Sequence, residues 1–221
     1  MASKFNVRFV SLSLILGGLM VIIGWLIMPV HVVLNFNLEM LNSIKEHHEF
    51  WVRSFQVMVF GLFIRIIALV SLGSLYSGSE AKPIVSAGIM VCSLAMLLTA
   101  ISEGYIMHTG GWAQWKMGLI PTDQHAPMLA ALELTNEWVS CMARMGRMFL
   151  HLGLVVLGWG IMRGDVLNKW MGTFALILGI AGITILMIID QNPTIYYPLG
   201  HAVTSWFIIA GVLLFRKNNK T

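Results

Sequence analysis

Ionisable residues lie inside stretches that are otherwise apolar, and their types and spacing could support chemistry. Arg144, Arg147 and His151 follow one another at i, i+3 and i+7, so a helix would carry them on one face. Arg65 and Glu103 lie within two other apolar stretches. A charge inside a membrane span is costly, so such residues usually face the interior of a bundle and pair there or serve a function. We therefore expect these residues to face one another.

The depth of these residues indicates a shared cavity. Helices rise 1.5 Å per residue, which places Arg65 and Arg147 roughly 13–17 Å from the outer ends of their stretches. Asp190 and His201 stand at the rim, where one apolar stretch ends and the next begins. The candidate ligand-binding residues are Arg65, Glu103, Arg144, Arg147, His151, Asp190 and His201. They predict a polar cavity that opens on the outer side of a membrane and is closed toward the cytoplasm.

The charges of this predicted cavity do not balance. Three arginines accompany one carboxylate well inside the apolar stretches, Glu103, whereas Asp190 and Glu137 are shallow. Buried positive charge in excess favours an anionic ligand, because arginine binds carboxylates and phosphates through paired hydrogen bonds. We therefore expect an anionic, amphipathic small molecule or lipid as ligand. The protein could act alone or as an accessory subunit beside other membrane subunits.

Two other interpretations stay open. In the first, Glu103 and Arg144 form a buried ion pair, His151 bonds to a neighbouring carbonyl, and the protein is a purely structural membrane subunit. In the second, Glu103, His151 or His201 performs acid–base or metal-assisted catalysis, and the protein is a membrane-embedded enzyme with its site at the outer face. Whether the protein is an enzyme is therefore left open.

The sequence does not specify a cofactor. Six of the seven histidines fall on the outer side, so a zinc or copper site is conceivable. Adjacent His47 and His48, however, point about 100° apart on a helix and rarely bind one ion together. Haem held by two histidines needs them at similar depth, and His151 lies deeper than His201. The sequence contains no P-loop, dinucleotide-binding or nucleophile-elbow motif.

The elements that position these residues follow from composition and hydropathy. Hydrophobic residues make up 57% of the 221 residues and charged residues 11%, against a usual charged share of roughly a quarter. This composition excludes an ordinary soluble protein, and the absence of a basic stripe argues against a nucleic-acid partner. Six apolar stretches are long enough, or nearly so, to cross a ~30 Å hydrocarbon core as helices. They are Phe9–Val30, Ser54–Tyr76, Ile84–Met107, Trp138–Met162, Met171–Ile189 and Leu199–Phe215.

These stretches predict an all-α fold, a six-helix transmembrane bundle that forms one domain over residues 1–221 in contact with membrane lipids. The longer connections, 31–53 and 108–137, fall on the outer side. Three lysines and arginines fall on that side and eight on the other, which predicts that both termini are cytoplasmic. The tryptophans expected at the membrane interfaces are Trp25, Trp51, Trp138, Trp159 and Trp170.

Capping residues and small residues predict where several of these helices begin and how one of them packs. Asn37 could cap a helix that runs toward Trp51 along the outer interface. Thr122 or Asp123 could begin a helix of about 35 residues that continues into the fourth span and projects beyond the membrane. The sixth span is short and could begin a turn before Leu199. Small residues form one stripe on the fifth span and would allow close helix packing: Gly172, Ala175, Gly179 and Gly182.

Charged residues, polar turns and apolar stretches follow one another in an order that extends over most of the chain. Arg8 precedes the first span, a polar turn with proline precedes the third (Ser77–Pro83), and Glu103 lies late in that span. Lys169 and Trp170 then open the fifth span, and the sixth ends in basic residues. This layout resembles the DUF4386 family of six-span prokaryotic membrane proteins, whose domain has no established activity. The resemblance implies the six-span architecture and a prokaryotic cell membrane, and it leaves the function open.

Overall fold

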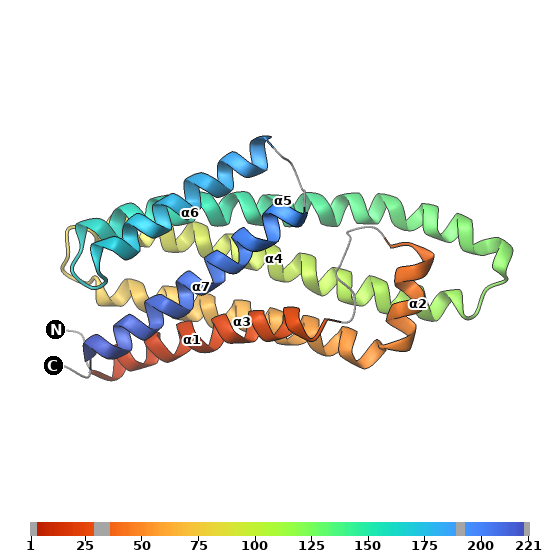
Figure 1. The fold of residues 1–221 in the computed structure, drawn as a ribbon, viewed down its shortest axis with the longest axis horizontal. Helices are drawn as coiled ribbons and strands as arrows, with labels where there is room; N and C mark the ends of the chain where they lie inside the picture. Colours follow the sequence, from red (N-terminus) through yellow and green to blue (C-terminus); the bar gives the residue numbers. More distant parts are fainter. Residues whose placement is uncertain (1–3, 29–35, 189–192, 219–221) are drawn as a thin grey trace.

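The structure, a computed structural model, describes residues 4–28, 36–188 and 193–218, and these residues form helices and short connections without any strand. Figure 1 shows the helices in their order along the chain. They are α1 (Lys4–Leu26), α2 (Leu38–Glu46), α3 (His48–Leu75), α4 (Lys82–Met117), the short 3₁₀ helix η1 (Thr122–Gln124), α5 (His125–Arg163), α6 (Lys169–Ile188) and α7 (Pro193–Asn218).

Among the described residues, six helices are long and apolar enough to cross a membrane: α1, α3, α4, α5, α6 and α7. Large apolar side chains cover the outside of the bundle, where a soluble protein would be polar. Phe60 is 62% exposed, Met90 69% and Met187 77%. Such a continuous apolar surface suits contact with lipid. The prediction of an all-α bundle with six membrane-length helices is thereby confirmed.

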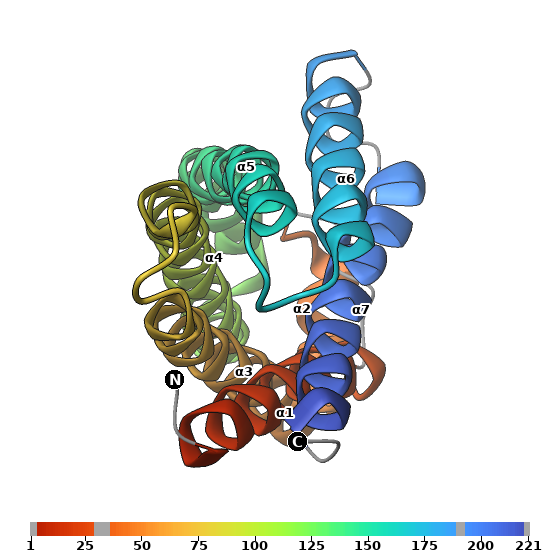
Figure 2. The same cartoon turned by 90° about the vertical axis from the view of Figure 1, so that its left-hand side faces the viewer.

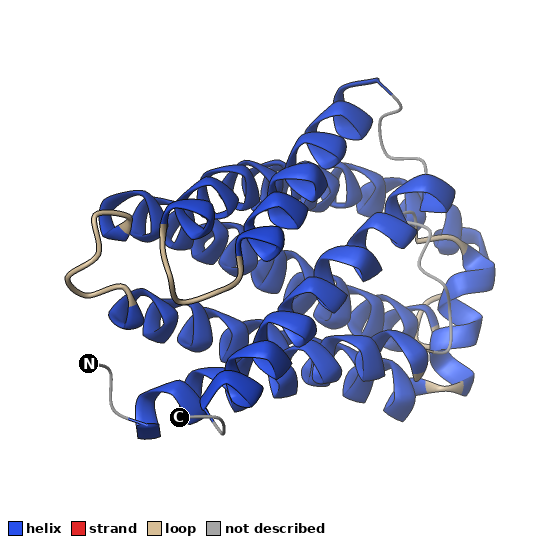
Figure 3. Ribbon diagram, turned by 60° about the vertical axis from the view of Figure 1, so that its left-hand side comes forward, coloured by secondary structure: helices blue, strands red, loops and turns tan. Residues whose placement is uncertain are grey.

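The six long helices form a ring. Each packs against the next one along the chain, and α7 closes the ring by packing against α1, as the end-on view in Figure 2 shows. The connections 76–81 and 164–168 lie at the same end of the bundle as both termini, and α2 and η1 lie at the opposite end (Figures 1 and 3). We call these the terminal end and the α2 end.

The end of α1 and the beginning of α7 differ from the predicted span boundaries. α1 ends at Leu26 instead of Val30, because residues that precede a proline, here Pro29, disfavour helical geometry. α7 begins at Pro193, more than a turn before Leu199, as its short apolar stretch suggested.

α4 is longer than the predicted third span. That span stops at Met107, whereas α4 has 36 residues and continues to Met117. α5 has 39 residues and follows η1 at Thr122–Gln124, which confirms the predicted long helix. At 1.5 Å per residue both helices are about 55 Å long, well beyond a ~30 Å hydrocarbon core. α4 continues because Ile106, Ala113 and Met117 pack in an apolar cluster with side chains of α2, α3 and α5.

Glycines bring α4 and α5 together along their length. Gly146, Gly153 and Gly160 recur every seven residues on α5 and are buried. A Cβ built on Gly153 would lie 2.5 Å from Cys92 Sγ and 2.8 Å from the Cys92 nitrogen, so no side chain fits there. The three glycines contact α4 in antiparallel register, at Thr99, Cys92 and Val85.

α6 packs on α5 through the stripe predicted for the fifth span. Its members are all buried: Gly172, Ala175, Gly179 and Gly182. A Cβ built on Gly179 would lie 2.6 Å from the His151 carbonyl oxygen and 2.8 Å from the Val155 nitrogen. Because both atoms belong to the α5 backbone, the two helices are in direct contact at this point.

α2 differs from the predicted interfacial helix. Asn37 caps it as expected, because its Oδ1 accepts a hydrogen bond from the Met40 nitrogen at 2.8 Å. At His47, however, the chain turns into α3, and Trp51 belongs to that helix. Trp51 is fully buried and donates its indole N–H to the Met107 carbonyl at 3.2 Å. Its predicted interfacial position is therefore wrong, because the indole is held between α3 and α4.

The terminal end of the bundle is closed by Tyr76. Its ring is fully buried against Gly164, where the lack of a side chain leaves space for it. Lys217 Nζ donates to the carbonyls of Asp165, at 2.5 Å, and Val166, at 3.2 Å, which fastens the end of α7 to the same connection.

Candidate ligand-binding cavity

A cavity of about 180 Å³ lies inside the ring, in the half nearer the α2 end. Five of the long helices contribute to it: α1, α3, α4, α5 and α7. Four of the residues predicted from the sequence line it: Arg65, Glu103, Arg147 and His201. Most of the remaining wall is apolar and includes Leu62, Met96, Ile106 and Leu150. The structure thus brings charged side chains from α3, α4 and α5 into one largely apolar space.

Arg65 is positioned by the contact between α1 and α3. A Cβ built on Gly17 of α1 would lie 2.9 Å from Arg65 Cγ, so this glycine leaves the space that the stem of the arginine occupies. The guanidinium carbon lies 5.1 Å from the centroid of the Phe207 ring, a cation–π contact. Arg65 is only 3% exposed. Its Nε and Nη2 nevertheless donate to no acceptor in the described part of the chain.

A buried arginine such as Arg65, with two donors that lack acceptors in the described part of the chain, is energetically unusual. Burying a charged group costs several kcal/mol unless hydrogen bonds and an opposite charge compensate for the lost water. The Phe207 ring compensates only in part, since a cation–π contact contributes about 2 kcal/mol when it is desolvated. An acceptor that carries negative charge would therefore stabilise Arg65 strongly.

Glu103 supplies the one carboxylate among the described residues that line the cavity. It interacts electrostatically with Arg147 of α5. Arg147 Nε also donates to the Ala143 carbonyl of its own helix at 3.2 Å. The structural interpretation pairs Glu103 with Arg144, whereas the charge that acts on Glu103 in the described part of the chain is that of Arg147. With two arginines and one carboxylate, the lining carries a formal charge of +1 when His201 is neutral.

Aromatic residues mark the mouth of the cavity. His201 is exposed and meets Trp25 of α1 edge-on, with ring centroids 6.1 Å apart. Trp25 was predicted as an interfacial residue and not as part of the site, because the position of a tryptophan near a span end does not indicate the direction of its side chain. Thr204 lies on the same face of α7, almost fully buried, and also lines the cavity. Asp190, predicted at this rim, lies outside the described residues.

Arg144 and His151 are placed away from the wall formed by the described residues. His151 is fully buried, its ring packs directly against Gly182 of α6, and it hydrogen-bonds to the Leu178 backbone. Residues at i, i+3 and i+7 spread over an arc of about 60° on a helix. Arg147 and His151 are four residues and about 40° apart on this arc, yet Arg147 faces the cavity while His151 faces α6, and the contacts of His151 suit a role in helix packing.

Packed aromatic side chains close the cavity toward the terminal end. Beyond Arg65, Phe207 and Trp206 are fully buried and meet edge-to-face with ring centroids 5.0 Å apart. Trp206 donates its indole N–H to the Met171 carbonyl at 3.0 Å, which ties α7 to α6. Leu72 and Tyr76 continue this apolar core to the end of the bundle. The cavity is thus closed at the terminal end, and its exposed residue, His201, lies toward the α2 end.

A metal centre is not formed by the residues that the structure describes, because no three His, Cys, Asp or Glu side chains come together there in a way that could hold an ion. His47 is the turn residue between α2 and α3, and His48 is the first residue of α3. His31 and Asp190 lie outside the described residues.

The fold and the cavity define a class of protein: a multi-pass helical membrane protein with a ring of six long helices and a charged internal cavity. No family model, curated protein or solved structure matches the chain. The resemblance to the DUF4386 family therefore stays an expectation, and the function has to be argued from the cavity itself.

Proposed function

We propose that the protein binds an anionic, amphipathic small molecule or lipid in the cavity between α1, α3, α4, α5 and α7. The observation that carries this proposal is the state of Arg65. It is buried, it lines the cavity, and two of its donors have no acceptor among the described residues. A carboxylate or phosphate can accept two parallel hydrogen bonds from a guanidinium and supply the missing counter-charge.

The rest of the lining supports an amphipathic ligand. Glu103 lies beside Arg147, so Arg65 is the cation most available to a bound anion. Apolar side chains, among them Leu62 and Leu150, surround these charges and would contact a hydrocarbon group. A volume of about 180 Å³ is below the roughly 300–1,000 Å³ of pockets that enclose a drug-sized ligand. The cavity therefore suits an anionic headgroup, and the remaining part of the ligand would extend past His201.

The distribution of basic residues supports an orientation in which the α2 end faces outward. The described lysines and arginines at the terminal end are Lys4, Arg8, Lys82, Arg163, Lys169, Arg216 and Lys217. Such an excess marks the cytoplasmic side of a membrane protein. In a prokaryotic cell membrane the cavity would then take its ligand from the outer leaflet or the external medium. The protein could work alone or as an accessory subunit of a larger membrane complex.

Arg65→Met tests the proposal directly. Loss of a charge-assisted hydrogen bond costs about 1.5–3 kcal/mol, so we expect ligand affinity to fall by about 10- to 100-fold. The variant should fold, because it removes a buried charge without orphaning a partner among the described residues. Native mass spectrometry and mass spectrometry of organic extracts would identify the anion that copurifies with the wild type and measure its occupancy in the variant.

Arg53→Met is the matched control. It makes the same substitution on the same helix, at an arginine whose exposed side chain pairs with Glu49 at 3.1 Å. This variant should retain the wild-type occupancy. If the wild type carries no anionic species, or if both variants retain it equally, Arg65 does not bind a ligand and the proposal is wrong.

A purely structural function is the second candidate, and the interaction between Glu103 and Arg147 is the observation that favours it. Under that alternative the charges of the cavity would hold the helices in register and bind nothing. Substitution of Glu103 distinguishes the two functions, because only the structural function requires its charge for stability.

A further inference from the structure

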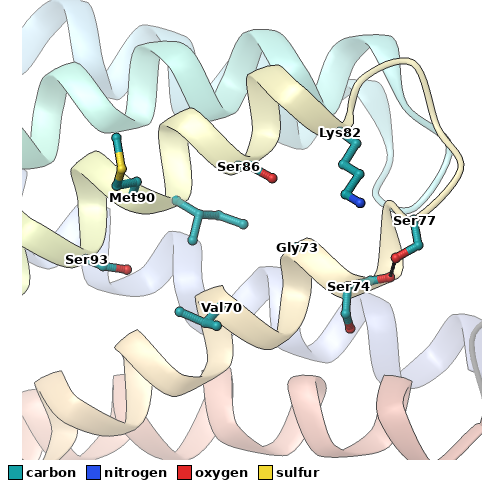
Figure 4. A pocket seen from close by; sticks show the side chains of 9 residues that line it. Val70, Gly73, Ser74, Ser77, Lys82, Ser86, Met90 and Ser93 are labelled. Atoms are coloured by element: carbon teal, nitrogen blue, oxygen red, sulfur yellow. Dashed lines mark hydrogen bonds between the residues drawn. The ribbon is translucent and has the colours of Figure 1, made fainter.

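A second cavity, of about 490 Å³, lies between α3 and α4 near the terminal end. It shares no described lining residue with the cavity inside the ring. Figure 4 shows that it lies where the end of α3 and the beginning of α4 face each other. We call it the α3–α4 groove, and its residues change in character along the two helices.

The part of the groove nearest the terminal end is polar and positive. The Lys82 side chain extends from the first turn of α4 into the space opposite Ser74 and Ser77 (Figure 4). Ser86 lies one turn farther along α4, on the same face as Lys82. The Ser74 and Ser77 hydroxyls donate to carbonyls of their own segment, each at 2.7 Å. Lys82 and Ser86 are thus the donors available to a ligand, and no carboxylate among the described residues lines the groove.

The deeper part of the groove is apolar and faces the outside of the bundle. Val70 is 61% exposed and Met90 69%. Along the helix axes Val70 lies about 10 Å beyond Ser77, and Met90 about 12 Å beyond Lys82. This depth falls within the hydrocarbon core if the ends of α3 and α4 lie at the membrane interface.

The deeper part of the groove contains open space beside Gly73 and a Ser93 hydroxyl that lacks a hydrogen-bond partner in the described part of the chain. Gly73 leaves the groove free on the α3 side, since a Cβ built there would meet only Ile89 Cδ1, at 3.2 Å. Ser93 contributes a buried Oγ that has no hydrogen-bond partner in the described part of the chain. A hydroxyl in this position requires an acceptor, and an ester carbonyl of a lipid would supply one.

We infer that the α3–α4 groove binds an anionic phospholipid from the leaflet at the terminal end. The phosphate lies against Lys82 and Ser86, and an acyl chain runs along Val70 and Met90. A positive charge at the interface above an apolar groove matches the order of groups in such a lipid. This inference does not depend on the ligand of the inner cavity, because the two sites share no described lining residue.

The test compares the thermal stability of the purified protein in nanodiscs of phosphatidylcholine with and without phosphatidylglycerol. Phosphatidylglycerol should raise the melting temperature of the wild type by a few degrees, and Lys82→Met should lose most of this rise. Because a lysine near an anionic surface contributes about 1 kcal/mol, its loss corresponds to roughly fivefold weaker lipid binding. Lys169→Met is the matched control, since Lys169 is exposed at the same end but lies outside the groove, and it should keep the rise.

Two additional measurements, on glycine variants and with inorganic phosphate, distinguish lipid binding in the groove from a general effect of charge. Gly73→Leu should abolish the effect of phosphatidylglycerol by filling the groove, whereas Gly104→Leu, on the open surface of α4, should not. Inorganic phosphate alone should give no stabilisation. An equal response of Lys82→Met and Lys169→Met would overturn the inference, and so would stabilisation by inorganic phosphate that matches that by the lipid. If Gly73→Leu does not fold, the comparison of the two lysine variants decides.

Discussion

At the scale of single residues, the charge of the cavity inside the ring comes from three side chains on three helices, Arg65, Glu103 and Arg147. Charges within apolar stretches were expected to face the interior at similar depths, and these three line one cavity in the structure. The same reasoning could not separate Arg147 from His151, because two side chains about 40° apart on one helix can face different neighbours. It also missed Trp25, whose orientation depends on the contact with His201 of a distant helix.

Glu103→Gln distinguishes ligand binding from a purely structural role. If a ligand supplies the counter-charge, the variant should fold, keep its melting temperature within a few degrees and still carry the anion. The lining then has one negative charge fewer, so anion affinity should rise. If Glu103 instead serves only to compensate Arg147, its loss removes the opposite charge from a partly buried arginine and should lower the free energy of unfolding, by at most the ~3–5 kcal/mol of a fully buried pair.

The measurements are thermal unfolding and ligand occupancy by mass spectrometry. Glu49→Gln is the control, because Glu49 is exposed in its pair with Arg53 and its loss should change stability little. A Glu103→Gln variant that unfolds, together with a wild type that carries no ligand, would favour the structural function.

At the scale of elements, small residues determine how α5 packs. Glycines on α5 contact α4, and the backbone of α5 contacts the small residues of α6. The stripe on α6 was predictable because small residues recur on one helical face. The heptad of glycines on α5 was equally visible in the sequence, but its partner helix was not. The extension of α4 past Met107 could not be predicted from hydropathy, because contacts with α2 and α5 stabilise it.

Gly179→Leu tests the contact between α5 and α6. Even a Cβ at this position would meet the α5 backbone at 2.6–2.8 Å, so the two helices must separate. We expect a loss of about 1–3 kcal/mol, the usual cost of overpacking, or more where only backbone can move. Thermal unfolding in detergent measures the change.

Gly104→Leu is the matched control for this substitution, because a Cβ at Gly104 would meet nothing within 4 Å. It should melt close to the wild type. Equal melting temperatures for Gly179→Leu and the wild type would show that α6 does not pack on α5 along this stripe.

At the scale of the whole molecule, the six helices of membrane-spanning length could be predicted from the sequence, because hydropathy is a local property. Closure of the ring by α1 and α7 was not predictable, since it depends on packing between the two ends of the chain. This closure matters for function, because α1 and α7 supply Trp25 and His201 at the mouth of the cavity.

The orientation in the membrane can be tested with single cysteines placed at exposed positions. In a Cys141→Ser background, which removes an exposed native thiol, cysteines at Asn42 and Asp123 should react with an impermeant thiol reagent in intact cells. Cysteines at Glu80 and Asn168, at the terminal end, should react only after the cells are permeabilised. The reverse pattern would place the cavity mouth on the cytoplasmic side.

The most direct test of ligand binding is an experimental density map of the wild-type protein, purified in its native lipids, around the guanidinium of Arg65. We expect density for a non-protein anion about 2.7–2.9 Å from Nε and Nη2, the range of charge-assisted hydrogen bonds, with an apolar portion extending toward His201. Density showing that both nitrogens bond only to side chains or carbonyls of the chain itself would contradict ligand binding in this cavity.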